Sequence, residues 1–241
     1  MLLHTRKVEK GTHHMAKKIN PVAGVSLMAY IDKNSILAEQ CRIIRSNIQF
    51  SSIDQPIQSV VITSAAAGEG KSTVAANLAV VFADSGKKTL LVDCDLRRPT
   101  VALTFKQWNH DGLTNLIGKG TEKIEDFVHE SGIDNLSILT SGPKPPNPSE
   151  MLGSQRMTDL MNEFKKEFDF IIYDLPPVSI ITDAQIIAAK ADATVLVARQ
   201  NQTQKQDFLQ SVKLLKMAKA NVIGVVYNNV KKNTDNYYYY G

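Results

Sequence analysis

The chain has 241 residues, of which 43% are hydrophobic and 22% are charged, and its net charge is +4. This length and composition suit one sizeable α/β domain that needs neither a disulfide nor a metal to hold it together. No apolar run approaches the ~18–20 residues that a membrane span requires. The cysteines Cys41 and Cys94 have no metal-ligand spacing, so we expect reduced thiols.

The positive charge lies at the beginning of the chain. Residues 1–20 carry five lysines or arginines and one glutamate, which accounts for the whole net charge. Residues 21–241 are therefore balanced, which argues against a nucleic-acid-binding face. A basic leader can contact anionic lipid or an acidic partner, but it is more often a solvated tail. The run His13-His14-Met15 leaves open whether residues 1–15 are native.

The first predicted helix begins at Asn34 or Ser35 and ends before Pro56. Its apolar residues recur at spacings of three to four, as an amphipathic helix requires; they are Ile36, Leu37, Cys41, Ile44 and Ile48. Before this helix, residues 1–33 show no clear periodicity. We treat them as a basic leader and a candidate docking segment.

Strands and helices then alternate along the chain. The predicted strands are 59–63, 89–92, 135–139, 170–173, 193–197 and 222–226, with helices over about 71–85 and 155–167. Residues 105–135, which include Trp108, His110 and His129, are predicted to be irregular. The proline-rich stretch 141–148 is expected to be a surface loop near the site. Continuous apolar strands alternating with helices predict a doubly wound, mainly parallel α/β sheet. Together with the glycine-containing loop over 68–73, which joins the first strand to the next helix, this pattern predicts a fold of the P-loop NTPase type, with the helical N-terminal extension, a domain over 34–230 and a tail over 231–241.

A glycine-containing loop follows the first strand and opens the next helix. It consists of Gly68, Glu69, Gly70, Lys71, Ser72 and Thr73. The glycines let backbone N–H groups approach phosphate, Lys71 can reach the β- and γ-phosphates of ATP, and the Ser72 hydroxyl can bind Mg²⁺. The usual first glycine of this motif is replaced by Ala65. We nevertheless predict an ATP site from the strand and helix that flank the loop.

Three aspartates follow predicted strands. Asp93 and Asp95 end the second strand, and Asp174 ends the fourth. Each alone is as often a helix cap or turn residue, but strand ends of a parallel sheet meet beside the phosphate loop. With Ser72, these carboxylates are candidate Mg²⁺ ligands, and one of them could accept the proton of an attacking hydroxyl.

The sequence resembles the bacterial tyrosine kinases of capsule and exopolysaccharide synthesis, in their short form without a fused membrane domain. The resemblance covers nearly all of residues 30–241 and rests on the segments 66–72, 90–99, 112–114, 141–150 and 171–177 and on four terminal tyrosines. It implies that Lys71 and Ser72 bind ATP and Mg²⁺, and that Asp93 accepts the tyrosine proton. Asp95 and Asp174 would then position the metal. Asn228 lies just past the last predicted strand, where an asparagine contacts the nucleotide base in related ATPases, so we expect the same contact here.

The resemblance also gives a function to both ends of the chain. Glu39, Arg42 and Arg45 fall on one side of the first helix and alone would suggest only a solvated face, but in the family this pattern builds a ring of subunits. The cluster Tyr237, Tyr238, Tyr239 and Tyr240 would be autophosphorylated in trans, although terminal tyrosines can also form an aromatic patch. The kinase would regulate polysaccharide polymerisation and export from the inner face of the cell membrane, where a membrane-embedded activator docks near residues 21–33.

Two other functions remain open at this point. A partition-type ATPase switch would share the sheet and the loop, but the septum-site and plasmid-partition ATPases carry a signature lysine at the position of Ala66. That class also leaves the tyrosine cluster unexplained. A non-catalytic assembly module would use the tail and ring alone and would tolerate loss of Lys71.

Overall fold

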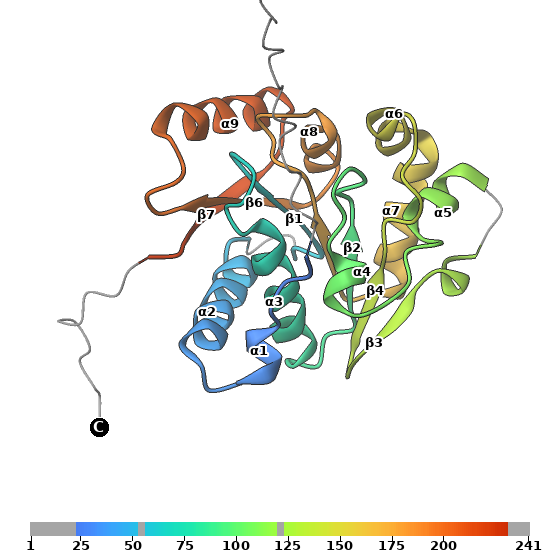
Figure 1. Ribbon diagram of the computed structural model, residues 1–241, viewed down its shortest axis with the longest axis horizontal. Coiled ribbons are helices and arrows are strands. Elements are labelled where there is room, and N and C mark those ends of the chain that lie inside the picture. Colours follow the sequence, from blue (N-terminus) through green and yellow to red (C-terminus); the bar gives the residue numbers. More distant parts are fainter. Residues whose placement is uncertain (1–22, 53–55, 120–122, 231–241) are drawn as a thin grey trace, which may run out of the picture.

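The computed structural model describes residues 23–52, 56–119 and 123–230 (Figure 1). Its centre is a seven-stranded sheet whose strands lie in the order β3 (His129–Ile133), β4 (Leu136–Leu139), β2 (Thr89–Asp93), β5 (Phe170–Asp174), β1 (Ser59–Ser64), β6 (Ala193–Arg199) and β7 (Val222–Asn228). Neighbouring strands are parallel except β3 and β4. The predicted fold class is confirmed.

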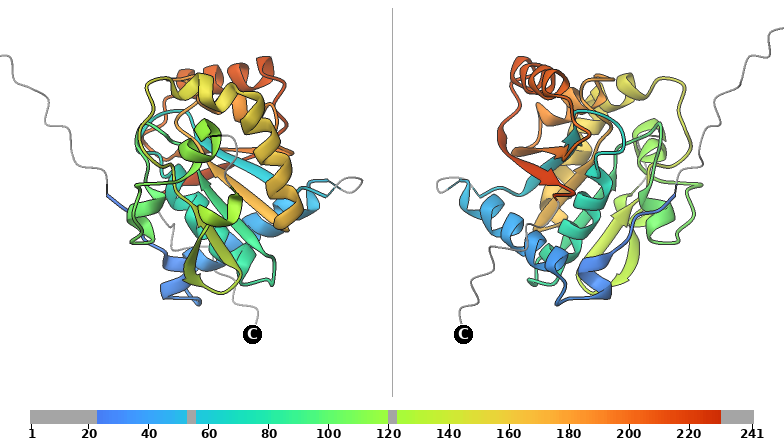
Figure 2. Two further views of the ribbon diagram at one scale, coloured as in Figure 1. Left: turned by 90° about the vertical axis from the view of Figure 1, so that its right-hand side faces the viewer. Right: turned by 60° about the vertical axis from the view of Figure 1, so that its left-hand side comes forward.

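Helices cover both faces of this sheet (Figures 1 and 2). One face carries α1 (Met28–Ile31), α2 (Ile36–Phe50), α3 (Lys71–Ala83) and α4 (Val101–Thr104). The other carries α5 (Leu113–Lys119), the short turn η1 (Ile124–Asp126), α6 (Pro148–Gly153), α7 (Gln155–Glu167), α8 (Asp183–Ala188) and α9 (Lys205–Met217). Within the described residues, none of these helices combines the length and the apolar character that a membrane crossing demands.

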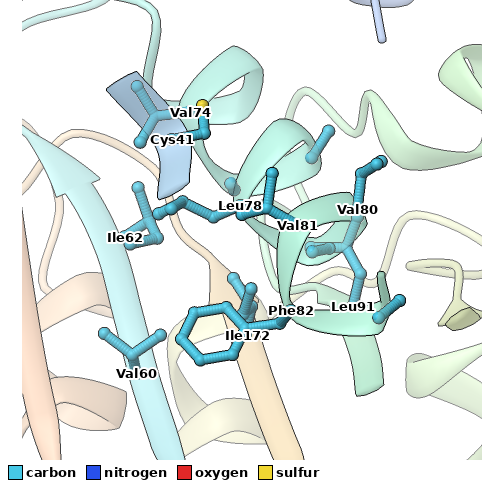
Figure 3. Packing of buried hydrophobic residues seen from close by; sticks show 14 of the residues in the cluster. Cys41, Val60, Ile62, Val74, Leu78, Val80, Val81, Phe82, Leu91 and Ile172 are labelled. Atoms are coloured by element: carbon cyan, nitrogen blue, oxygen red, sulfur yellow. The ribbon is translucent and has the colours of Figure 1, made fainter. Parts of the chain in front are cut away.

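Each strand contributes to both cores because successive side chains point to opposite faces. In β1, Val60 and Ile62 face α3, whereas Val61 faces the opposite helical layer. Figure 3 shows the α3 side, where Leu78, Val81 and Phe82 gather over the strands. The Phe82 ring stacks on Phe170 of β5 with centroids 3.6 Å apart. Since α3 lies between the sheet and α2, it is apolar on nearly all sides.

The N-terminal helix forms as its pattern predicts. The Ser35 hydroxyl accepts a hydrogen bond from the Ala38 N–H and caps the start of α2. Ala38, Cys41 and Ile48 are buried on one side of the helix, which packs on α3. The described part of the predicted 34–230 domain thus includes α2 as an integral layer.

The prediction of irregular structure over residues 105–135 is wrong in two places. Residues 113–119 form α5, and residues 129–133 form β3. The β3 sequence His-Glu-Ser-Gly-Ile lacks the apolar residues by which the other strands were predicted. An edge strand does not need them, because β3 is held by backbone pairing to β4. Trp108 remains exposed and stacks on His110 with ring centroids 5.5 Å apart.

The proline-rich stretch is only partly a surface loop. Ser141 is buried and its hydroxyl bonds with the side chain of Asn109, which also contacts Gly142. Pro148 then opens α6, where its missing N–H costs no helical hydrogen bond.

At the amino-terminal ends of the central strands, Asp192, which directly precedes β6, fixes the start of β1. Its carboxylate accepts hydrogen bonds from the N–H groups of Gln58 and Ser59, from the Ser59 hydroxyl and from Lys165. Partial burial alone would raise the pKa of Asp192, but the bonds from Lys165 and Ser59 outweigh it and hold the pKa below its usual value. The charged form is therefore favoured in the folded protein.

We expect Asp192→Ala to lower the free energy of unfolding by about 1.5–3 kcal/mol at pH 7, because buried N–H groups lose a charged acceptor. A group with a depressed folded pKa stabilises above its unfolded pKa, so this contribution is lost as the pH falls below about 3.8. Denaturant unfolding of both proteins between pH 7 and pH 3 measures the effect. A difference between them that stays constant as the pH falls below 4 would contradict this account.

Candidate active site

The site lies where three neighbouring strands end. In the β2–β5 pairing, Asp93 stands directly opposite Asp174, and Asp174 stands opposite Ile62 near the end of β1. The phosphate loop continues from β1 into α3. The structure thus brings together Lys71, Ser72, Asp93, Asp95 and Asp174, as the strand-end argument predicts.

Lys71 is the centre of the cluster. Its Nζ lies 3.0 Å from Asp95 Oδ2, 3.4 Å from Asp174 Oδ1 and 3.1 Å from the Ser72 hydroxyl. Burial alone would lower the pKa of Lys71, but Asp174 and Asp95 outweigh it and raise the pKa above its usual value. The ammonium group is therefore charged and held beside the loop that would bind phosphate.

Asp93 lies under the site and is fully buried. One oxygen accepts the N–H groups of Thr100 and Val101 at 2.9 Å each, and the other accepts the Asp95 N–H at 3.2 Å. Burial, assisted by the nearby Asp174, raises the pKa of Asp93 to about 7. Asp93 thus holds the turn at Asp95 and the N–H groups at the start of α4, which fits the turn role expected of a strand-end aspartate, whereas the N-cap residue of α4 is Thr100.

Asp174 is also buried. Burial raises its pKa, although the Lys71 ammonium and a hydrogen bond from Ser72 act in the opposite direction. Its second oxygen lies 3.5 Å from the Thr100 hydroxyl. Thr100, which the sequence argument did not select, therefore contacts both Asp93 and Asp174. Asp95 accepts the Arg98 N–H and pairs with Lys71.

The phosphate loop has the backbone shape that its glycines predict. Gly68 and Gly70 have φ angles of 80° and 93°, a region that other residues rarely adopt. A side chain at Gly70 would also meet Asn228, whose Nδ2 would lie 2.2 Å from the added carbon. Asn228 in turn donates to the Glu69 carbonyl at 2.9 Å.

Side chains at the end of β6 and just after it also support this loop, and the sequence argument missed them. Glu69 is buried, and its carboxylate accepts bonds from the Ala66 N–H and the Thr203 hydroxyl. Arg199 donates to the Gly68 carbonyl, and Gln202 donates to the Ala67 carbonyl. The Glu69 carboxylate therefore points into the loop and supports its shape. Only the polar character of residues 199–204 after an apolar strand could have signalled this brace.

A groove of about 730 Å³ adjoins the loop between α2, α3 and β7. Thr73, Asn77 and Asn228 line it on the side of the loop, and Ile36, Leu37 and Val230 are among its apolar residues. Its size and its mixed lining suit a planar ring with polar edges. Thr73 and Asn228, both predicted to bind a cofactor, lie at its edge.

The residues predicted to bind Mg²⁺ do not form a closed set of ligands by themselves. Within the part of the chain that the structure describes, no three His, Cys, Asp or Glu side chains are placed as a ready metal cage. Mg²⁺ requires few protein oxygens, since phosphates and waters complete its shell. Ser72 with Asp95 or Asp174 fits such a site, whereas Asp93 already binds three N–H groups.

The predicted interface residues lie on α2 and also contact their own chain. Arg42 pairs with Glu39 at 2.9 Å and donates to the Lys33 carbonyl. Arg45 donates to the Val81 carbonyl near the end of α3. The predicted tail 231–241, with Tyr237 to Tyr240, and the leader through residue 22 lie outside the described residues.

Comparison with known proteins gives concordant matches. A family model described as an AAA domain matches residues 57–225. Tyrosine-protein kinase YwqD of Bacillus subtilis is 44% identical over 90% of this chain and 91% of its own length. Putative tyrosine-protein kinase CapB of Staphylococcus aureus is 40% identical over 94% of this chain and 99% of its own length.

Solved structures separate the alternatives. The chimerical protein CapA2B2 superposes with a TM-score of 0.82 at 38% identity, over 88% of this chain and 95% of that chain. The septum site-determining protein MinD of Pyrococcus horikoshii, complexed with Mg-ADP, reaches a TM-score of 0.60 at 24% identity over 70% of this chain and 69% of that chain. The second likeness shows a common fold alone.

Proposed function

The chain belongs to the bacterial tyrosine-protein kinases, and we propose that it phosphorylates its own C-terminal tyrosines in trans, with ATP as donor and Mg²⁺ as the metal. Kinase membership follows from relatives at 40–44% identity over at least 90% of the chain. The partition-type switch, by contrast, is supported only by a shared fold, and this chain has Ala66 where that class carries its signature lysine. The observation that carries the proposal is the Lys71 cluster beside the phosphate loop.

The loop and its lysine would bind the nucleotide. When bound, Mg²⁺–ATP supplies the phosphoryl group and a cation that offsets the charge of its oxygens. Gly68 and Gly70 turn the loop N–H groups toward the phosphates, helped by the N-terminal end of α3. Lys71 would exchange Asp95 and Asp174 for phosphate oxygens, and the groove beside Thr73 and Asn228 would take the base.

The carboxylates would divide the remaining chemistry. We propose Asp93 as the proton acceptor of the tyrosine hydroxyl, with Ser72, Asp95 and Asp174 holding the metal. Asp95 and Asp174 already lie within 3.4 Å of the lysine that neutralises them. Thr100 donates its N–H to Asp93 and its hydroxyl to Asp174, so that a shift of one carboxylate would displace the other.

Assembly would bring the acceptor of one subunit to the site of the next. Exposed Ile36, Ile43 and Phe50 recur every seven residues along α2, beside Glu39 and Arg42. Such an apolar row on one helix favours contact with a second copy. We propose that this helix contributes to a ring, and that a membrane-embedded activator docks at residues 21–33 and holds the kinase at the inner face of the membrane. There it would regulate capsular or exopolysaccharide polymerisation.

Mixing two variants that cannot phosphorylate their own tails tests transfer in trans. Lys71→Met keeps its tyrosines and serves as acceptor, while a variant with Tyr237 to Tyr240 changed to phenylalanine keeps its site and serves as donor. Incubated together with ATP, Mg²⁺ and an activator fragment, they should yield phosphate on the tyrosines of the Lys71→Met chain, as detected by mass spectrometry. Phosphorylation that occurs in the wild type but never in the mixture would show transfer within one chain.

A further inference from the structure

Residues 24–29, the N-terminal strap, contact α4 at Gly24 and Val25 and end in the first two residues of α1. A side chain at Gly24 would place its first carbon 2.8 Å from the Leu103 carbonyl group and from the Thr104 nitrogen. The Val25 N–H donates to the Thr104 hydroxyl oxygen at 3.0 Å. In Figure 1 this blue segment passes between α3 and α4 before it enters α1. The strap is thus in backbone contact with the helix that follows the Asp93–Asp95 turn.

The other end of the strap is fixed to α3 by one buried side chain. Asn77 accepts the Ala29 N–H at 2.9 Å and donates to the carbonyls of Ser26 and Thr73, each at 2.9 Å. Asn77 is fully buried. Thr73 lies in the first turn of α3, directly after the glycines of the phosphate loop, so the strap is joined to the nucleotide half of the site as well.

Thr104 continues the connection toward the carboxylates. Its hydroxyl donates to the Thr100 carbonyl at 2.7 Å. Thr100 donates its N–H to Asp93 at 2.9 Å, and its hydroxyl lies 3.5 Å from Asp174. One hydroxyl group therefore links the strap to the residue that contacts both buried aspartates. A hydrogen-bond chain of this kind transmits position because each bond constrains the next.

We propose that Thr104 is a positioning residue for phosphoryl transfer: with Asn77 it lets the N-terminal strap set the placement of Asp93 and Asp174 relative to the phosphate loop. The inference rests on the proposed phosphoryl-transfer function and adds residues that no motif of the site contains. It also gives a physical route by which a partner bound near residues 21–33 would act on catalysis. Pulling the strap off α4 would remove the Val25 bond to the Thr104 hydroxyl, and so loosen one of the two Thr104 bonds to the Thr100 carbonyl, without touching Lys71.

A matched pair of variants tests the link. Thr104→Val keeps the shape of the side chain but removes its hydroxyl, whereas Thr104→Ser keeps the hydroxyl. In Thr104→Val we expect the Val25 amide to exchange its hydrogen faster and ATP turnover to fall by about threefold to tenfold, the effect of one lost hydrogen bond. The Kd of ADP should change less than twofold, because the phosphate loop is untouched. Thr104→Ser should restore both exchange and turnover.

Turnover is measured as total ADP formed by the full chain, with the activator fragment present. This readout counts each transfer whether tyrosine or water accepts the phosphoryl group, so it remains valid if tail phosphorylation is disproved. Should Thr104→Val fail to fold, Gly24→Ala provides a second disruption, since its methyl group would collide with backbone of α4. Ser26→Ala is the control, because Ser26 is exposed and contributes its carbonyl to the contact with Asn77.

Two results would overturn the proposal. Faster hydrogen exchange of the Val25 amide with unchanged ATP turnover would mean that the strap packs on α4 but does not affect catalysis. An equal loss of turnover and of ADP affinity would mean that the substitution disturbs the whole site. Lower turnover at preserved affinity, rescued by serine, is the expected pattern.

Discussion

Replacing Lys71 with methionine is expected to lower the rate of phosphoryl transfer by roughly 100- to 1000-fold, the loss typical of a removed charge-stabilising group. The ammonium group lies 3.0 Å from Asp95 and 3.4 Å from Asp174 and is held charged among them. Methionine keeps the length of the side chain but supplies no charge for phosphate. A variant that transfers within tenfold of the wild type would contradict this role of Lys71, whereas a wild type that transfers no phosphate and assembles normally without Lys71 would favour a non-catalytic assembly module.

The same substitution should destabilise the protein by about 3–5 kcal/mol, because it leaves buried carboxylates without their cation. Asp93 and Asp174 have raised pKa values, so they can take up protons at low pH and reduce the loss. The stability difference should therefore be larger at pH 8 than at pH 5. Denaturant unfolding at both pH values checks this, with Lys87→Met, an exposed lysine, as the control.

Replacing the four tyrosines Tyr237–Tyr240 with phenylalanine should remove tail phosphorylation and keep the subunits assembled in the presence of ATP. Four phosphates would add roughly −6 to −8 charges, which would repel one another and the carboxylates of a neighbouring site. We expect wild type to dissociate after incubation with ATP and the phenylalanine variant to stay assembled. Light scattering coupled to size exclusion measures both masses.

The matched control is wild type incubated with ADP, which carries no transferable γ-phosphoryl group. It should keep the mass of the phenylalanine variant. Identical assemblies for phosphorylated and phenylalanine protein would show that the tail charge does not govern subunit contacts. The ring proposal for α2 would then need a different switch.

Sequence periodicity predicted the sheet because most strands are buried on both faces and therefore apolar throughout. Residues 59–63, 89–92 and 170–173 all became strands, and the rule that ligands lie at strand ends correctly grouped Lys71, Asp93 and Asp174. It failed for β3, whose polar sequence is held by pairing to β4. Edge pairing leaves no signature in the residues themselves.

Contacts between distant segments were also beyond prediction. Thr203 and Glu69 are 134 residues apart, Asp192 and Ser59 are 133 apart, and Asn77 and Ala29 are 48 apart. Each pair meets only after the sheet has formed, so neither spacing nor motif reveals it. The sequence placed Asp93 at the site but could not show that three backbone N–H groups already bind it.

The most direct test of the account is mass spectrometry of the C-terminal peptide after incubation of the full chain with ATP, Mg²⁺ and the activator fragment. The account predicts phosphate on Tyr237 to Tyr240 that is absent in Lys71→Met and absent when the metal is chelated. An unmodified peptide accompanied by ATP hydrolysis, in a sample where activator binding is demonstrated, would contradict it.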